Sequence, residues 1–105
     1  MKNLWVKKKF FDLIVEGKKT LEVRVLYPSL RSIQKGDLIS LNKKAIIRVK
    51  DIRLYPNFET MLQYEDASKI LPGSNREEVL RCLQSLYSPQ KERLGVFVFE
   101  IELVK

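Results

Sequence analysis

Apolar and polar side chains alternate strictly over residues 20–26, which read TLEVRVL. A period of two predicts a β-strand whose apolar side chains face the protein core. The opposite face then presents Thr20, Glu22 and Arg24, with successive members about 6–7 Å apart. Such a polar face is most often a solvated surface, where a Glu–Arg pair contributes only about 0–1 kcal/mol.

The segment before this strand has the spacing of a helix. Apolar side chains recur every three to four residues over 8–17, and Gly17 follows the last of them. Glycine ends a helix readily because it adopts left-handed backbone angles without steric cost. We therefore expect a short strand over 4–7, a helix over 8–17, and backbone amides around Gly17 that are open to an anion.

The middle of the chain predicts a β-hairpin with a long second strand. Residues 37–41 and 45–55 have strand patterns, and residues 42–44 form the tip between them. In the second strand the apolar parity slips by one residue near Lys50–Asp51, which a β-bulge explains. Residues 27–37 are expected to form a crossing loop with one helical turn.

Three helical segments and a final strand follow. Helical spacing covers 56–65, 66–73 and 74–87, and alternation returns over 95–104. Ser74 and Glu77 have the spacing of a capping box at the start of the third helical segment.

The order of these elements restricts the fold class. Strands and helices do not alternate regularly, which argues against a parallel, doubly wound sheet. We expect one domain over residues 1–105. Its class is α+β, a small, partly closed β-barrel of five to six strands with three to four flanking helices.

Charge and composition narrow the function. The net charge is +7, and residues 1–55 hold 14 Lys and Arg against 5 Asp and Glu, a net of +9. Residues 56–105 hold 6 against 8, a net of −2. A basic half predicts a polyanionic partner such as nucleic acid, although dispersed, solvated lysines give the same charge.

Histidine is absent from the sequence, and cysteine occurs once, as Cys82. The lack of histidine excludes Ser-His-Asp and Cys-His catalysis and most zinc sites, so we expect no metal and no cofactor. Cys82 lies in an apolar helical pattern and is expected in the core. No apolar run is long enough to cross a bilayer, so we expect a cytoplasmic protein with no membrane partner.

Gly17, Lys19, Glu22 and Arg24 together spell G-x-K-x-x-E-x-R. This pattern resembles the signature of the ASCH (ASC-1 homology) family, a branch of the PUA-like barrels. Further segments resemble the family in the same order along the chain: IQKGDLISLN at 33–42, RVKDIRLYPNFETMLQYE at 48–65, ILPG at 70–73 and GVFVFEIE at 95–102.

The resemblance implies a PUA-like barrel that binds RNA or a nucleotide-like ligand in a cleft beside the motif strand. One branch of small family members hydrolyses N4-acetylcytidine with a lysine, a threonine and a glutamate. Lys19 matches that lysine, Glu22 stands where that branch has its threonine, and Glu78 is nearest to the glutamate. The candidate catalytic set is therefore Lys19, Glu22 and Glu78.

Three functions remain open from the sequence: a binding module for RNA or nucleotides, a small hydrolase of the acetylcytidine or ribonuclease type, and a protein-interaction domain. In the first, Lys19 holds an anion beside an ionised Glu22; in the second, a desolvated Lys19 moves a proton. The candidate ligand-binding residues are Gly17, Lys18, Lys19, Thr20, Glu22, Arg24, Arg48 and Lys50.

Overall fold

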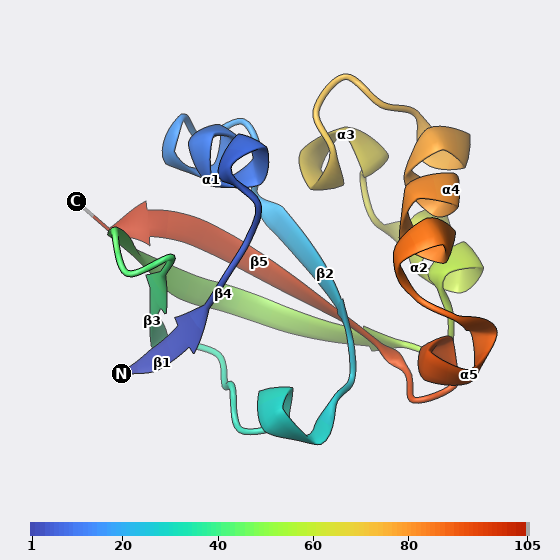
Figure 1. Cartoon of the computed structure of the whole chain (residues 1–105), viewed down its shortest axis with the longest axis horizontal. Coiled ribbons are helices and arrows are strands. Elements are labelled where there is room, and N and C mark those ends of the chain that lie inside the picture. Colours follow the sequence, from blue (N-terminus) through green and yellow to red (C-terminus); the bar gives the residue numbers. More distant parts are fainter. Residues whose placement is uncertain (105) are drawn as a thin grey trace.

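The computed structural model describes residues 1–104, which form one five-stranded mixed sheet curved into a half-barrel with helices packed against it (Figure 1). This architecture confirms the predicted α+β class and the partly closed barrel. The strands are β1 (Lys2–Leu4), β2 (Leu21–Val25), β3 (Leu38–Leu41), β4 (Ala45–Tyr55) and β5 (Val96–Val104). The helices are α1 (Lys8–Val15), α2 (Phe58–Tyr64), α3 (Ala67–Ile70), α4 (Arg76–Leu86) and α5 (Pro89–Glu92), with a single 3₁₀ turn at Pro28–Leu30.

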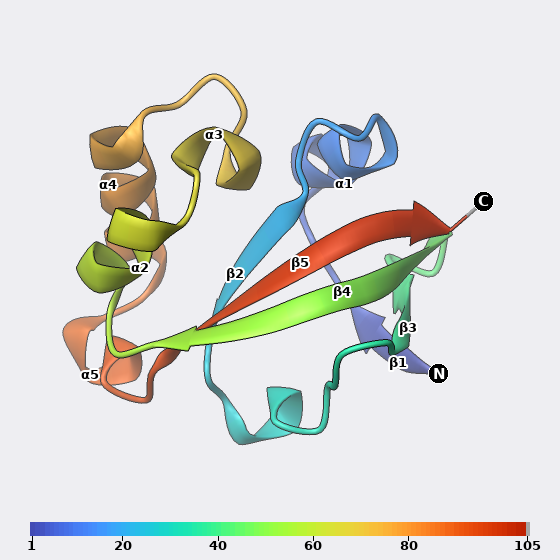
Figure 2. The same cartoon turned by 180° about the vertical axis from the view of Figure 1, so that it is seen from behind.

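The strand order across the sheet is β1-β3-β4-β5-β2. β1 pairs with β3 in parallel, and the other three pairs are antiparallel. The long strands β4 and β5 form the middle of the sheet, as the view from behind shows (Figure 2). β2 is therefore an edge strand. The predicted bulge is confirmed, because the β4–β5 register shifts between Val49 and Asp51.

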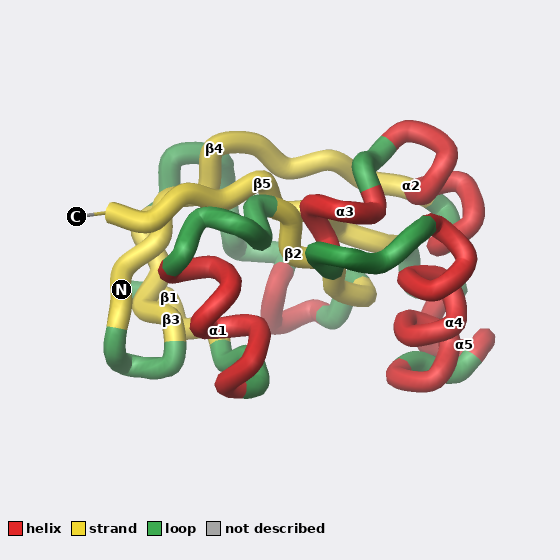
Figure 3. Tube along the Cα trace, turned by 90° about the horizontal axis from the view of Figure 1, so that it is seen from above, coloured by secondary structure: helices red, strands yellow, loops and turns green. Residues whose placement is uncertain are grey.

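The sheet separates two hydrophobic cores. Leu21, Val23 and Val25 of β2 pack with α2, α3 and α4 on one side. Ile14 of α1 packs on the other side with Phe97 and Phe99 of β5. Strand alternation sends neighbouring residues of β2 and β5 into opposite cores, as their sequence pattern predicts. Seen from above, β2 consequently lies between α1 on one side and α3 on the other (Figure 3).

The first strand differs from the prediction. It covers Lys2–Leu4 rather than residues 4–7. The reason is a side chain at the hairpin tip: Asn42 accepts a hydrogen bond from the N–H of Val6 and donates one to its carbonyl, each at 2.8 Å. These bonds satisfy the backbone of Val6 without a neighbouring strand, so strand pairing stops at Leu4.

The helix ends are set by side-chain caps. Asn57 accepts from the N–H of Thr60 at the start of α2, at 2.7 Å. The capping box of α4 is formed by Asn75 and Glu78 and not by the predicted Ser74 and Glu77. Asparagine caps as well as serine does, and the helix begins one residue later than expected. The sequence pattern also missed α5, a four-residue helix.

Candidate functional site

The backbone of β2 bonds to β5 through alternate residues. The N–H of Ile101 donates to the carbonyl of Thr20 and that of Leu26 to the carbonyl of Gly95, each at 2.9 Å. In an antiparallel ladder this phase directs the N–H and C=O groups of Glu22 and Arg24 toward β5. The backbone groups of Leu21, Val23 and Val25 point away from the sheet.

The ammonium group of Lys19 is buried at this edge, with 4% of the residue exposed. Its Nζ donates to the carbonyls of Leu21 at 2.7 Å and Ile70 at 2.6 Å, and it lies 3.1 Å from Oε1 of Glu22. Two of the three N–H donors of the ammonium group thus bond to backbone carbonyls, and Glu22 supplies the counter-charge. Lys19 therefore joins β2, α3 and the Glu22 carboxylate at one point.

Glu22 is also buried, and it stands between two cations. Its Oε2 accepts from Nε of Arg24 at 2.7 Å, which confirms that Glu22 and Arg24 share a strand face. A terminal nitrogen of Arg24 donates to the carbonyl of Trp5 at 2.8 Å. The third polar residue of the predicted face, Thr20, precedes the strand, and its N–H donates to the carbonyl of Lys69 in α3.

A cleft of about 70 Å³ opens at this edge of the sheet. Its lining residues come from α1, from α4 and from the end of α3 as well as from β2. Helix α1 lies on one side of β2, and α3 and α4 lie on the other (Figure 1). Apart from the polar side chains at its floor the lining is apolar. The lining residues are Phe10, Lys19, Glu22, Val23, Ile70, Leu71, Val79, Cys82, Leu83 and Leu86. Cys82, expected in the core, is half-buried in this wall.

A second groove, of about 340 Å³, lies on the other side of Lys19. Gly17, Thr20 and Lys50 line it together with Lys69 and Glu100, so four of the predicted ligand-binding residues meet around it when Lys19 is included. Nζ of Lys50 lies 3.9 Å from a carboxylate oxygen of Glu100.

The backbone around Gly17 does not offer the open amides that were expected. The N–H of Gly17 donates to the carbonyl of Ile14, and those of Lys18 and Lys19 both donate to the carbonyl of Leu13. Gly17 has a φ of +78° and serves as the left-handed residue after α1. Its role is to end the helix, and the prediction of an amide site for an anion is wrong.

The remaining predicted residues lie outside the cleft. Lys18 is exposed and pairs with Glu16 at 3.0 Å. Arg48 is exposed on β4 and pairs with Glu102 of β5 at 3.2 Å. Glu78 lies in the first turn of α4, where it accepts from the N–H of Asn75 at 3.0 Å, so the structure does not bring it to Lys19 and Glu22.

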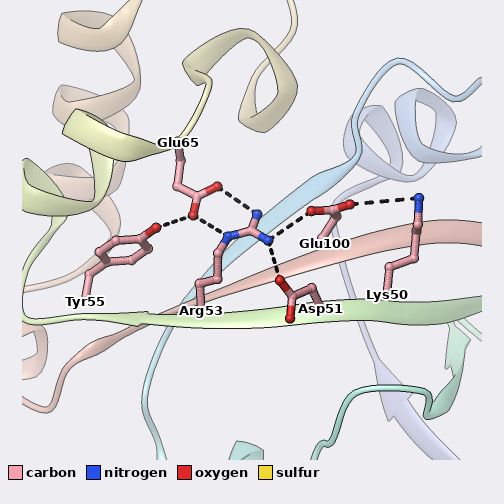
Figure 4. Close-up of polar contacts among 6 residues, drawn as sticks. All are labelled: Lys50, Asp51, Arg53, Tyr55, Glu65 and Glu100. Carbon is pink, nitrogen blue, oxygen red and sulfur yellow. Dashed lines mark hydrogen bonds and ion pairs between the residues drawn. The ribbon is translucent and has the colours of Figure 1, made fainter.

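A second charged network was not anticipated from the sequence (Figure 4). Nε and a terminal nitrogen of Arg53 donate to the two oxygens of Glu65 at 2.6 and 2.8 Å. Arg53 also donates to Asp51 and Glu100, each at 2.9 Å, and the hydroxyl of Tyr55 donates to Glu65. Strand parity places Asp51, Arg53 and Tyr55 on one face of β4, and that was the available signal.

This network perturbs the pKa values of its members. Burial alone raises the pKa of Glu65, but the hydrogen bonds from Arg53 and Tyr55 outweigh it and bring the pKa below its ordinary value. Burial and the bond to Glu65 raise the pKa of Tyr55 to about 12. The hydrogen bonds that Arg53 donates to Glu65, and then to Glu100 and Asp51, raise its own pKa. At neutral pH, Arg53 and Glu65 are therefore both charged, and the hydroxyl of Tyr55 beside them is neutral.

The comparison with protein families identifies the chain, because the model of the ASCH domain matches residues 4–105. The chain belongs to the ASCH domain family. The family resemblance inferred from the G-x-K-x-x-E-x-R pattern is thereby confirmed, and this ASCH domain occupies nearly the whole sequence.

Solved structures agree with this assignment. The hypothetical protein PH0355 has a crystal structure that matches with a TM-score of 0.92 at 33% identity, covering 99% of this chain and 100% of that chain. Protein PF0455 from Pyrococcus furiosus, solved by NMR, matches with a TM-score of 0.83 at 34% identity, covering 99% and 97%. Protein EF3133 from Enterococcus faecalis V583 shares the fold, with a TM-score of 0.67 at 14% identity over 99% and 76%.

No curated protein matches the chain. Within residues 1–104, no helix has the length and apolar character required to cross a membrane.

Proposed function

We propose that this ASCH domain binds RNA or a nucleotide-like ligand in the cleft at the free edge of β2. The observation that carries the proposal is the buried Lys19–Glu22 ion pair in the lining of an apolar cleft, with Arg24 bonded to Glu22 beside it. Desolvating charged groups costs several kcal/mol per ion, on the order of the whole stability of a small domain. Such an arrangement in a concave site is typical of a functional site.

The mouth of the cleft supports a ligand with phosphates. Phe10 forms part of the α1 wall, and Nζ of Lys9 lies 4.9 Å from the centroid of its ring. Lys7, Lys8 and Lys9 are exposed together at the start of α1. A flat ring between the apolar walls would leave its phosphates near these lysines, which is how single-stranded nucleic acids are commonly held.

The geometry favours binding over proton transfer at Lys19. The ammonium group donates hydrogen bonds to two backbone carbonyls and forms an ion pair with Glu22, so it is held within the protein. A general base must reach the proton it removes, and here the nitrogen faces Leu21, Glu22 and Ile70. We therefore place the hydrolase interpretation second to binding.

Titration of labelled single-stranded RNA at two salt concentrations, about 50 and 200 mM, tests the proposal. We expect binding that weakens steeply with salt. Lys9→Ala should weaken it several-fold, because a phosphate contact is removed at the mouth. Lys91→Ala is the matched control, since Lys91 is an exposed lysine on the distant helix α5 and should bind as wild type does.

The reactivity of the single cysteine tests where the RNA binds. Cys82 lines the cleft, so saturating RNA should slow its alkylation by iodoacetamide. Absence of binding at low salt would reject the proposed function. Binding that leaves the alkylation rate of Cys82 unchanged would place the RNA elsewhere on the surface and reject the cleft as its site.

A further inference from the structure

The free edge of β2 presents one N–H group and one C=O group without a hydrogen-bond partner to the cleft. The outward carbonyl of Leu21 accepts from Lys19, and that of Val25 accepts from the N–H of Tyr27 at 2.8 Å. Val23 lies between them. Its N–H and C=O point away from β5, and within residues 1–104 neither has a hydrogen-bond partner in the protein.

An unused pair at this depth is unusual. Val23 is only 6% exposed and lines the cleft. More than about 90% of buried backbone polar groups are hydrogen-bonded, and a buried polar group without a hydrogen bond destabilises the fold. The partner for Val23 must therefore come from outside the chain.

The occupied neighbours restrict what can bind there. An added peptide strand pairs through every second residue of an edge, which here requires Leu21, Val23 and Val25 together. Because the carbonyls of Leu21 and Val25 are taken, a strand cannot extend the sheet. One adjacent donor and acceptor remain, and they complement an amide-like edge that also presents one acceptor and one donor.

The volume and charge of the cleft point to the same chemistry. A space of about 70 Å³ is several times the roughly 10–15 Å³ that one water molecule requires, but it is too small for a whole nucleotide, so it takes one edge of a planar ring. A carboxylate accepts at about four lone-pair positions, and Lys19 and Arg24 use two of those of Glu22. The floor is thus rich in acceptors, which disfavours a phosphate.

We propose that the backbone N–H and C=O groups of Val23 bind the hydrogen-bonding edge of a nucleobase while the phosphate stays outside the cleft. This inference rests on the proposed function and specifies which part of the ligand enters. The donor of the base bonds to the carbonyl of Val23, and the neighbouring acceptor of the base receives its N–H. Glu22 lies next in the chain and can accept from a further N–H of the base.

Backbone amide NMR spectra test the inference on the intact protein. Three kinds of probe are used. The first is the four ribonucleosides; the second is a counterpart of each in which methyl groups replace the N–H hydrogen atoms of the base-pairing edge; the third is inorganic phosphate. We expect at least one nucleoside to shift the amide proton resonance of Val23 downfield. Its methylated counterpart should bind at least about tenfold more weakly. Phosphate should leave this amide unmoved. Val49 of β4, whose N–H donates to the carbonyl of Asp37 at 2.9 Å outside the cleft, is the internal reference.

A backbone variant tests the donor directly. The N–H of Val23 is not used in the ladder, and proline is tolerated at such edge positions, so Val23→Pro removes the donor without breaking a strand bond. Val23→Ile keeps the N–H and is the matched control. We expect Val23→Pro to bind the nucleoside at least about tenfold more weakly than Val23→Ile. If Val23→Pro fails to fold, the amide shifts of the wild-type protein still decide.

The outcomes separate this inference from the proposed function. RNA binding without any nucleoside binding leaves the proposed function standing and overturns the inference. Equal affinity for a nucleoside and its methylated counterpart, or a bound nucleoside that leaves the Val23 amide unmoved, also overturns it. If neither RNA nor nucleosides bind, both proposals fail.

Discussion

The two charged networks of this ASCH domain are built in different ways. The network of Lys19, Glu22 and Arg24 comes from six consecutive residues, and its cation Lys19 is 4% exposed. The network around Arg53 joins β4, β5 and the residue after α2, and the side chain of Arg53 is 30% exposed. The network of Lys19 is local in sequence and buried. The network of Arg53 is brought together by the fold and is partly exposed to solvent.

The networks also differ in what they bond to. Lys19 spends two of its three donors on backbone carbonyls, whereas Arg53 bonds to three carboxylates. Both nevertheless hold α3, since Glu65 immediately precedes its N-cap and the carbonyl of Ile70 ends it. Helix α3 forms part of the cleft wall, so the network at its far end supports the geometry at Lys19.

Removing the carboxylate of the buried network should have the largest effect. Glu22→Ala leaves the Lys19 ammonium without its counter-charge in a buried position, and Arg24 loses its carboxylate partner and keeps only the carbonyl of Trp5. We expect a loss of about 3–5 kcal/mol in the free energy of unfolding, the usual cost of breaking a buried pair. Urea denaturation followed by circular dichroism measures it.

Two variants sharpen this result. Glu77→Ala removes an exposed carboxylate whose i,i+4 contact with Arg81 is 3.8 Å, and it should change stability by less than about 0.5 kcal/mol. The double variant Lys19→Met, Glu22→Leu should recover much of the loss, because no uncompensated ammonium remains. A Glu22→Ala protein as stable as wild type would show that the network contributes nothing to the fold.

The fold-assembled network should give a smaller effect. Arg53→Ala leaves Glu65, whose side chain is 5% exposed, with only the hydroxyl of Tyr55 as a partner. We expect a loss of about 1–3 kcal/mol, the cost of an unsatisfied buried group that solvent can partly reach. Arg48→Ala on the same strand, whose pair with Glu102 is exposed on both sides, should lose less than about 1 kcal/mol. Equal losses for Arg53→Ala and Arg48→Ala would contradict the distinction between them.

Sequence periodicity predicted what depends on local spacing. The alternation over β2 and β5 gave the correct core faces, and the parity slip gave the bulge. The pairing of Glu22 with Arg24 follows from the same alternation. Each of these features is settled by residues a few positions apart.

The features that the sequence did not show depend on contacts between distant segments. Nothing near Lys19 indicates that the carbonyl of Ile70, 51 residues away, completes its coordination. The pairing of Arg53 with Glu65 and Glu100 depends on where α2 ends and on the β4–β5 register. The first strand was misplaced for the same reason, because the Asn42 side chain that replaces strand pairing at Val6 comes from the hairpin tip.

The smallest predicted effect concerns the phenol of the fold-assembled network. The folded-state pKa of Tyr55 is raised from 10.0 to about 12, so the neutral phenol is favoured in the fold. Its contribution to stability is complete below the unfolded pKa of about 10 and is lost as the pH rises toward 12. Tyr55→Phe should therefore cost only about 1 kcal/mol at neutral pH, the worth of one hydrogen bond.

Phenolate absorbance checks this value on the folded protein. Four tyrosines contribute to the titration, and the difference between wild type and Tyr55→Phe isolates one of them. We expect that difference to be centred about two pH units above an ordinary tyrosine, because burial disfavours the phenolate and ionisation would also break the hydrogen bond to Glu65 and place a second negative charge against it. A difference centred near pH 10 would mean that the hydroxyl of Tyr55 does not bond to Glu65 in solution, and that Arg53 alone holds this carboxylate at the start of α3.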